Sequence, residues 1–289
     1  MAMDTPVELF SIGPQEAGQI APLLTAEAAD LLRAGEAFGL AVVEEGEARG
    51  AVCARLSPES DRSLELISFY VAPAYRRRRL GGTLLLELLE ACEEELDGTI
   101  EAVEASFFPE PGLEGLLAKA GFRIEPAGKD LYSRIVPTAK LADAPLMKLE
   151  PPPLKDCRLV PAEELSPFQI QQLFQTLERK GADYMEPEQL ANALPGPSYV
   201  LADAGQRPLA CAIFTGQGNS LCLSQFFIAS PRAAAAVAVL QASARSLMER
   251  YPEGQLEIPL LAASSAKLVD RLLGGIGERK PLLRAVLEM

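Results

Sequence analysis

The chain has 289 residues, of which 48% are apolar, and its 27 basic and 40 acidic side chains give a formal net charge of −13. This length predicts one large domain or two of ordinary size. So acidic a chain is a poor candidate for coating nucleic acid, which takes many cations, and its lack of histidine excludes His-based triads, His general bases and most zinc sites.

The cysteines and the apolar segments bear on location. The five cysteines are scattered, odd in number and without C-x-x-C spacing, which predicts buried free thiols and a cytoplasmic, reducing environment. No basic segment followed by an apolar run opens the chain, and no apolar run reaches about 18 residues. We therefore expect neither secretion nor a membrane partner.

The first half alternates strand-like and helix-like patterns. In chain order we expect a strand over 6–12, one or two helices over 15–34, a hairpin of 39–46 and 49–57, a strand over 63–73, a helix over 80–96, a strand over 99–107, a short helix over 113–122 and a strand over 130–136. Pro73 ends the long strand, and Gly121 ends the short helix.

The second half repeats this order with little residue identity. Its expected elements are a strand over 157–164, helices over 166–180 and 186–194, a hairpin of 198–203 and 207–216, a strand over 221–231, a helix over 232–250, a strand over 255–264, a short helix over 266–275 and a strand over 281–289. Three consecutive prolines, 151–153, favour an extended linker over 138–156. The predicted domains are therefore 1–137 and 157–289.

The segment 71–83, VAPAYRRRRLGGT, combines features that suit an anion. Pro73 ends the strand, four arginines follow, and the predicted helix begins near Leu80. The first amides of a helix have no partners within it and lie at the positive end of its dipole. Gly81 and Gly82 lack a Cβ, so a diphosphate can approach the backbone.

This segment resembles the acyl-CoA loop of the GCN5-related N-acetyltransferase (GNAT) family, V-x-P-x-x-[RQ]-x-x-G-x-[GA]. Val71, Pro73, Arg76 and Gly81 match in register, whereas Arg79 stands where the family has its first glycine. The element order of residues 6–136 is also similar to the family's. The resemblance implies an α+β, three-layer α/β/α fold of two GNAT-like domains, each with a mixed, largely antiparallel sheet flanked by helices.

The resemblance also implies the site. Acetyl-CoA or another acyl-CoA is the expected co-substrate, with no metal. Loop amides from Arg76 to Thr83 would hold the pyrophosphate, and the strand backbone, which has a β-bulge in the family, would pair with the pantetheine arm. The expected cofactor-binding residues are Phe69, Tyr70, Val71, Arg76, Arg77, Arg78, Arg79, Gly81, Gly82 and Thr83.

The implied reaction is acetyl transfer to a small amine or amino-acid-like acceptor in one ternary complex. A strand amide near Val71 would stabilise the oxyanion. Without histidine, the candidate bases are Glu65 and Glu104. Family members often carry a tyrosine acid where this chain has Leu117, so the candidate acids are Tyr132 and Tyr70, unless the thiolate leaves without one.

The second half lacks the cradle, because alanines 233–236 replace the glycines and the basic run. We expect it to be a degenerate copy with a structural role. Residues 15–36 and 181–197 would line the acceptor side. The alternatives are a CoA or acyl-CoA sensor without turnover and a transferase that uses charged tRNA, which the acidic charge opposes. The expected partners are a small amine and no nucleic acid, for a monomer or homodimer.

Overall fold

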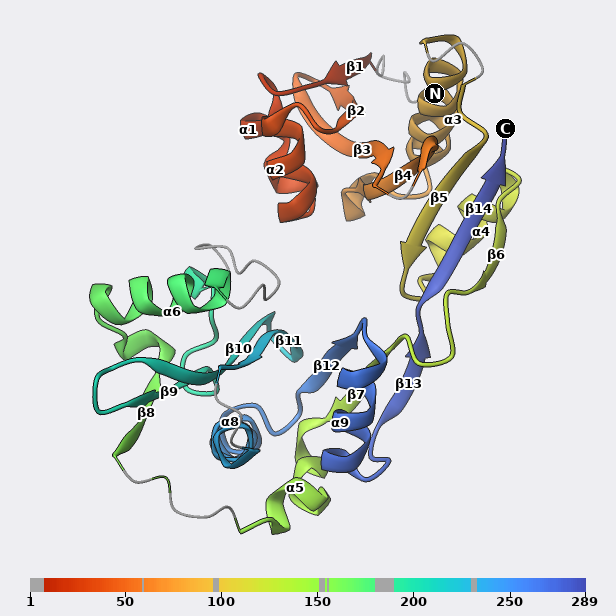
Figure 1. Ribbon diagram of the computed structural model, residues 1–289. Coiled ribbons are helices and arrows are strands. Elements are labelled where there is room, and N and C mark those ends of the chain that lie inside the picture. Colours follow the sequence, from red (N-terminus) through yellow and green to blue (C-terminus); the bar gives the residue numbers. More distant parts are fainter. Residues whose placement is uncertain are drawn as a thin grey trace. The chain divides into compact units, whose positions relative to one another are not determined.

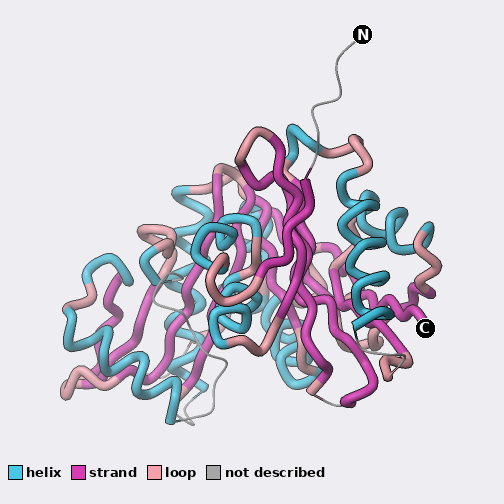
Figure 2. Tube along the Cα trace, turned by 90° about the horizontal axis from the view of Figure 1, so that it is seen from above, coloured by secondary structure: helices cyan, strands magenta, loops and turns pink. Residues whose placement is uncertain are grey.

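The computed structural model describes residues 8–58, 60–95, 99–150, 154, 156–179, 190–229 and 233–289. The chain divides into two compact units. Unit 1 comprises residues 1–128 and 282–289, and unit 2 comprises residues 129–281. Each unit has one sheet with helices packed against it (Figures 1 and 2).

Unit 1 has a seven-stranded sheet in the order β1-β2-β3-β4-β5-β14-β6, in which only β4 and β5 are parallel. Its elements are β1 (Glu8–Ile12), α1 (Ala17–Ile20), η1 (Ala21–Leu23), α2 (Ala26–Ala34), β2 (Phe38–Glu44), β3 (Glu47–Ser57), β4 (Ser60–Val71), η2 (Pro73–Tyr75), α3 (Leu80–Glu95), β5 (Ala102–Phe107), α4 (Pro111–Lys119), β6 (Arg123–Pro126) and β14 (Leu283–Glu288).

The two faces of this sheet carry different helices. Leucines of α3 and α4, including Leu84, Leu85 and Leu117, are fully buried against one face. Apolar residues of α1 and α2, including Ala28 and Leu32, are buried against β1–β3 on the other. The leucine spacing predicted for 80–96 therefore forms the stripe that α3 presents to the core.

Unit 2 has the sheet order β13-β7-β12-β11-β10-β9-β8, in which only β11 and β12 are parallel. Its elements are β7 (Tyr132–Pro137), η3 (Thr138–Asp143), α5 (Pro145–Lys148), β8 (Cys157–Pro161), η4 (Ala162–Glu164), α6 (Pro167–Arg179), β9 (Tyr199–Asp203), β10 (Pro208–Gln217), β11 (Ser220–Ile228), α8 (Ala233–Arg250), β12 (Gln255–Leu260), α9 (Ala263–Leu273) and β13 (Glu278–Pro281). The predicted α+β architecture with two mixed sheets is confirmed.

The two units exchange their closing strands. β7, which was expected to close the first sheet, pairs with β12 and β13 in unit 2. β14, at the end of the chain, lies between β5 and β6 in unit 1 (Figure 1). The predicted boundaries 1–137 and 157–289 differ from the observed division for this reason. An antiparallel strand can pair with either sheet, and local sequence carries no record of the choice.

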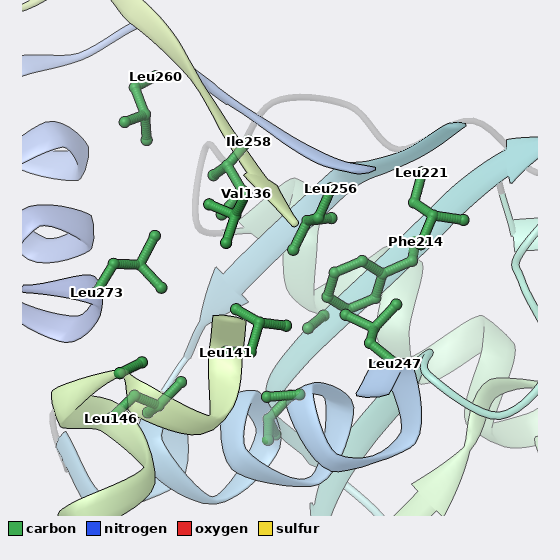
Figure 3. Close-up of a cluster of buried hydrophobic side chains, with 14 of the residues drawn as sticks. Val136, Leu141, Leu146, Phe214, Leu221, Leu247, Leu256, Ile258, Leu260 and Leu273 are labelled. Atoms are coloured by element: carbon green, nitrogen blue, oxygen red, sulfur yellow. The ribbon is translucent and has the colours of Figure 1, made fainter. Parts of the chain in front are cut away.

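The predicted linker is also largely structured. η3 and α5 occupy 138–148, and Leu141 and Leu146 are buried in the core of unit 2. Figure 3 shows these two leucines in the same cluster as Val136 of β7 and Leu256 of β12. Most of the segment expected to be extended therefore contributes to a core, whereas residues 151–153 lie outside the described residues.

Two expectations concern segments that are only partly described. The predicted helix 186–194 and the predicted acceptor-side segment 181–197 are described only from Leu190 onward. No helix in the described ranges is long and apolar enough to span a membrane. None of the five cysteines, all of which lie within the described residues, forms a disulfide, and Cys53, Cys92 and Cys211 are buried. Burial raises the pKa of Cys53 and that of Cys211 to about 12, which keeps both thiols protonated at neutral pH.

Candidate functional site

The parallel strands β4 and β5 separate part-way along their length. They pair over four positions, from Ser63 with Ala102 to Leu66 with Ala105. At this point β4 has a bulge at Ile67. Cys53 of β3 faces Ser68, whereas the next residue of β3, Ala54, faces Leu66, so Ile67 has no facing residue on β3. A bulge bends its strand. From Ile67 to Val71, β4 therefore pairs only with β3, and its other edge is open.

The backbone groups at this open edge belong to Phe69 and Val71. The Ala72 N–H donates to the Arg49 carbonyl of the β3 side at 2.8 Å. Because backbone groups alternate between the two edges of a strand, those of Val71 and Phe69 point away from β3. The Val71 carbonyl accepts from Arg76 Nε at 3.0 Å. This edge can thus add one more extended, amide-bearing chain.

The loop between β4 and α3 has an unusual backbone. Arg77 and Arg79 have φ of 67° and 66°, in the left-handed region that glycine adopts most easily. The Thr83 N–H makes the first helical bond of α3, to the Arg79 carbonyl at 3.1 Å. The amides of Leu80, Gly81 and Gly82 precede that bond, and the described residues provide no acceptor for them. Arg79 therefore keeps the backbone shape expected of the glycine it replaces.

We expect Arg79→Gly to stabilise the protein. A left-handed residue with a Cβ costs about 1 kcal/mol, so removing the side chain should raise the free energy of unfolding by a similar amount, measured by far-UV circular dichroism in urea. Arg76 is the matched control, since its φ of −63° suits any residue. If Arg76→Gly raised the free energy of unfolding by the same amount, the left-handed backbone of Arg79 would not be the source of the gain.

Side chains hold this loop against the sheet. The two terminal guanidinium nitrogens of Arg78, Nη1 and Nη2, donate to Glu44 at the end of β2, and the Nη1 bond is 3.0 Å long. The Tyr75 ring centroid lies 4.6 Å from the guanidinium carbon of Arg49 and 5.3 Å from that of Arg78. Arg78 therefore pairs with Glu44 of β2. The hydrogen bond from Arg78 lowers the pKa of Glu44.

This ion pair makes a pH-dependent contribution to stability. A carboxyl whose pKa is lowered by folding stabilises the native state above its unfolded pKa, here the ordinary value of 4.5, and that contribution disappears as the pH falls through the lowered value. We expect Glu44→Gln to be less stable than the wild type at pH 7, with the difference shrinking as the pH is lowered toward 3. Urea titrations across this range test it. The neighbouring Glu45→Gln should show no such convergence.

Two arginines of the loop remain for an anion. The side chains of Arg77 and Arg79 are exposed, and no partner for either is found among the described residues. Arg76 lies 3.6 Å from Glu110, with nearly half of its side chain exposed. Three free amides at the start of a sixteen-residue helix and two unengaged guanidinium groups form a seat for a phosphate-bearing ligand.

The two glycines of α3 have different surroundings. A Cβ on Gly81 would lie 3.3 Å from Phe69 Cζ and 3.4 Å from Leu116 Cδ2, whereas one on Gly82 would meet nothing nearer than 3.9 Å. Gly81 is therefore needed for close packing of α3 against β4 and α4, a reason that differs from the phosphate access expected from sequence.

We expect the alanine variants of these two glycines to differ in stability. Alanine is favoured over glycine in a helix by roughly 0.5–1 kcal/mol. Gly82→Ala should gain stability of this order, but Gly81→Ala should gain little because Phe69 must shift. Urea unfolding of both variants provides the measurement, and equal gains would show that the contact with Phe69 is unimportant.

The candidate bases lie side by side at the closed end of the strand separation. Glu65 of β4 faces Glu104 of β5 in the parallel register. Arg55 of β3 binds Glu65 through Oε2 alone, from Nε at 2.9 Å and Nη2 at 2.8 Å. Arg284 of β14 binds both oxygens of Glu104, at 3.1 and 2.7 Å. Sequence reasoning missed both arginines, because their pairing with these carboxylates depends on strand register.

The two candidate acids belong to different units. Tyr132 was expected on the strand that closes the first sheet, but it belongs to unit 2, where its hydroxyl donates to Asp270 at 2.8 Å. Burial and that bond raise the pKa of Tyr132. Leu117 is buried in the core of unit 1. Tyr70 lies on β4, and its ring centroid is 5.8 Å from the guanidinium carbon of Arg76.

Unit 2 repeats the strand separation in its own sheet. β11 pairs with β12 only from Ser220 to Cys222, and β11 has a bulge at Ser224. Residues 230–232, which precede α8, lie outside the described residues, and Ala235 and Ala236 in the first turn of α8 are buried. Across the described part of both units, no group of acidic or cysteine side chains is arranged to hold a metal.

Comparisons with known proteins give a family match for the first part of the chain and a fold similarity for the whole of it. Residues 6–122 match the model of the Acetyltransferase (GNAT) family, while no curated protein sequence matches the chain. A tandem GNAT protein from the clavulanic acid biosynthesis pathway superimposes over 98% of both chains, with a TM-score of 0.55 and 14% identity. A GCN5-related N-acetyltransferase from Sphaerobacter thermophilus covers 100% of this chain and 97% of its own, with a TM-score of 0.40 and 14% identity.

Proposed function

We propose that this chain, whose residues 6–122 match the GNAT family model and whose fold is similar to that of a tandem GNAT protein, is an acetyl-CoA-dependent N-acetyltransferase that acts on a small amine or amino-acid-like acceptor. Transfer takes place in unit 1, within one ternary complex. The observation that carries the proposal is the coincidence of three features in one place: separated strands, free amides at a helix start, and paired carboxylates.

The co-substrate is held by backbone first. Its diphosphate lies on the amides of Leu80 to Gly82, with Arg77 and Arg79 adding charge. Its amide-bearing arm extends along the open edge from Val71 to Ile67, about 13 Å at strand spacing, displacing Arg76 from the Val71 carbonyl. The acetyl group then reaches the closed end of the separation, where Glu65 faces Glu104.

The chain's own residues account for the transfer. The ammonium of the acceptor gives one proton to Glu65, either directly or through a water molecule. The Oε1 atom of Glu65 can take this proton, because it has no partner among the described residues. The amine nitrogen bonds to the thioester carbon as the carbon–sulfur bond breaks, and its second proton goes to the departing thiolate. The Phe69 N–H, which points into the open edge two residues from Ile67, stabilises the charge that develops on the carbonyl oxygen. No tyrosine is required, since a thiol of pKa near 8.5 is a fair leaving group.

Two measurements test the proposal. Acetyl-CoA should raise the thermal midpoint of unfolding, and a panel of primary amines should release free CoA thiol, detected with a chromogenic disulfide. Reversing the charges of Arg77 and Arg79 to glutamate should weaken the stabilisation, whereas the same reversal at Arg123, an exposed arginine on β6, should not. Stabilisation without thiol release would favour the sensor alternative. The absence of any stabilisation would refute both functions.

A further inference from the structure

Four charged side chains form a row across unit 1, which we call the charged row: Arg55, Glu65, Glu104 and Arg284. Arg55 faces Glu65 in the antiparallel register of β3 and β4, and Glu65 faces Glu104 in the parallel register of β4 and β5. Arg284 of β14 faces Ser106, two residues from Glu104 along β5, and binds Glu104. Facing residues share a face of the sheet, so the charges run positive, negative, negative, positive.

The row lies on the face of the sheet that carries α2. Arg55 lies 3.4 Å from Glu27 in the first turn of α2. Thr25, the N-cap residue of that helix, donates through its hydroxyl to the carbonyl of the bulge residue Ile67 at 3.4 Å. The opposite face is filled by α3 and α4. An acceptor that approaches the closed end of the strand separation on the α2 face therefore meets the row.

The charge of the row is balanced, although the chain as a whole is strongly acidic. The two carboxylates at the centre attract the amine that reacts. The two guanidinium groups at the ends oppose a second positive charge on the same acceptor and favour a negative one. Arg284 is the more accessible of the two, with 45% of its side chain exposed against 21% for Arg55, so the far end of an acceptor senses Arg284 more strongly.

The equivalent positions of unit 2 show what has been lost there. Counted from the bulge of β11, Thr215 replaces Arg55 and Cys222 replaces Glu65. Glu257 takes the place of Glu104, and Ser133 takes that of Arg284, donating to Glu257 at 2.7 Å. Unit 2 therefore keeps one carboxylate of the row and neither arginine, which restricts the charge pattern to unit 1.

We propose that Arg284, supplied by the last strand of the chain, is a specificity-determining residue that makes unit 1 select acceptors with a single amine and a neutral or anionic remainder, and reject diamines. This inference rests on the proposed acetyl transfer. It assigns to β14 a part in acceptor choice besides its part in the sheet.

Three acceptors with the same four-carbon chain test the inference, because they differ in the group at the far end, which is anionic, neutral or cationic: 4-aminobutanoate, butylamine and 1,4-diaminobutane. The wild type should acetylate them with kcat/KM falling in that order. Arg284→Gln should raise the ratio for 1,4-diaminobutane over 4-aminobutanoate by about tenfold, as expected for one nearby charge in partly screened surroundings. Arg284→Lys should keep the wild-type order. Arg62→Gln, which breaks the exposed pair with Glu101 beside the same strands, should change nothing.

The outcomes separate the two proposals. A wild type that prefers 1,4-diaminobutane, or a ratio that Arg284→Gln leaves unchanged, overturns the inference while thiol release upholds acetyl transfer. If no amine of any class releases thiol, the proposed function fails and the inference with it. If other amines react but these three do not, calorimetric titration of the three into the protein with bound CoA decides. Tighter binding of the diamine to the wild type than to Arg284→Gln overturns the inference.

Discussion

A chain that ends at Pro281 is expected to lose the folded structure of unit 1 together with its binding of acetyl-CoA. β14 pairs with β5 over six residues and with β6 over four, and Ala285 is completely buried. Without β14, β6 has no partner strand and an interior edge of the sheet is opened to water. The loss should exceed roughly 5 kcal/mol, which is the whole stability of many domains.

The measurement is thermal unfolding with and without acetyl-CoA, with circular dichroism as the readout. Unit 2 contains all of its own strands, so the truncated chain should retain one unfolding transition and lose the one that acetyl-CoA shifts. A chain ending at Glu288, which lacks only the exposed Met289, is the control. A synthetic peptide of residues 282–289 should restore part of the stabilisation. Full acetyl-CoA stabilisation in the truncated chain would show that β14 is dispensable.

Glu65→Gln is expected to lower kcat by about 10² to 10⁴, the usual contribution of a positioned general base. Glutamine keeps the size of the side chain and its contact with Arg55 but cannot take the proton of the ammonium. Glu104→Gln should instead leave kcat within about tenfold of the wild type, because Arg284 already occupies both oxygens of Glu104, and should mainly raise KM for the amine by leaving Arg284 unbalanced.

Steady-state kinetics with a fixed amine and saturating acetyl-CoA distinguish the two carboxylates. The thermal stabilisation by acetyl-CoA should be unchanged in both variants, since neither residue lies at the phosphate seat. Glu101→Gln, which removes the exposed partner of Arg62 just before β5, controls for the loss of one charge. If Glu104→Gln proved the slower enzyme, the two roles would have to be exchanged.

The conformation of the loop between β4 and α3 was predictable because its determinants are consecutive. Pro73 ends the strand, the arginines form the turn, and the leucines of 80–96 set the face of α3 that is buried. Even the departure at Arg79 had a local answer, since the residue adopts the left-handed backbone that the loop requires. By contrast, the predicted acid Tyr132 depended on which sheet the strand 130–136 would join, and the structure puts it in unit 2.

The amino-acid sequence by itself determined most of the elements, their repeated order and the loop of residues 71–83, because hydrophobic period, proline, glycine and arginine act over a few neighbouring residues. The two mixed sheets were expected from the resemblance to the GNAT family. Only the tertiary structure decided that β7 and β14 exchange sheets, that Glu65 and Glu104 stand side by side, and that Arg55 and Arg284 flank them. Strand pairing joins residues as far apart in the sequence as Ala102 and Glu288, and its register is chosen by the packing of a whole sheet.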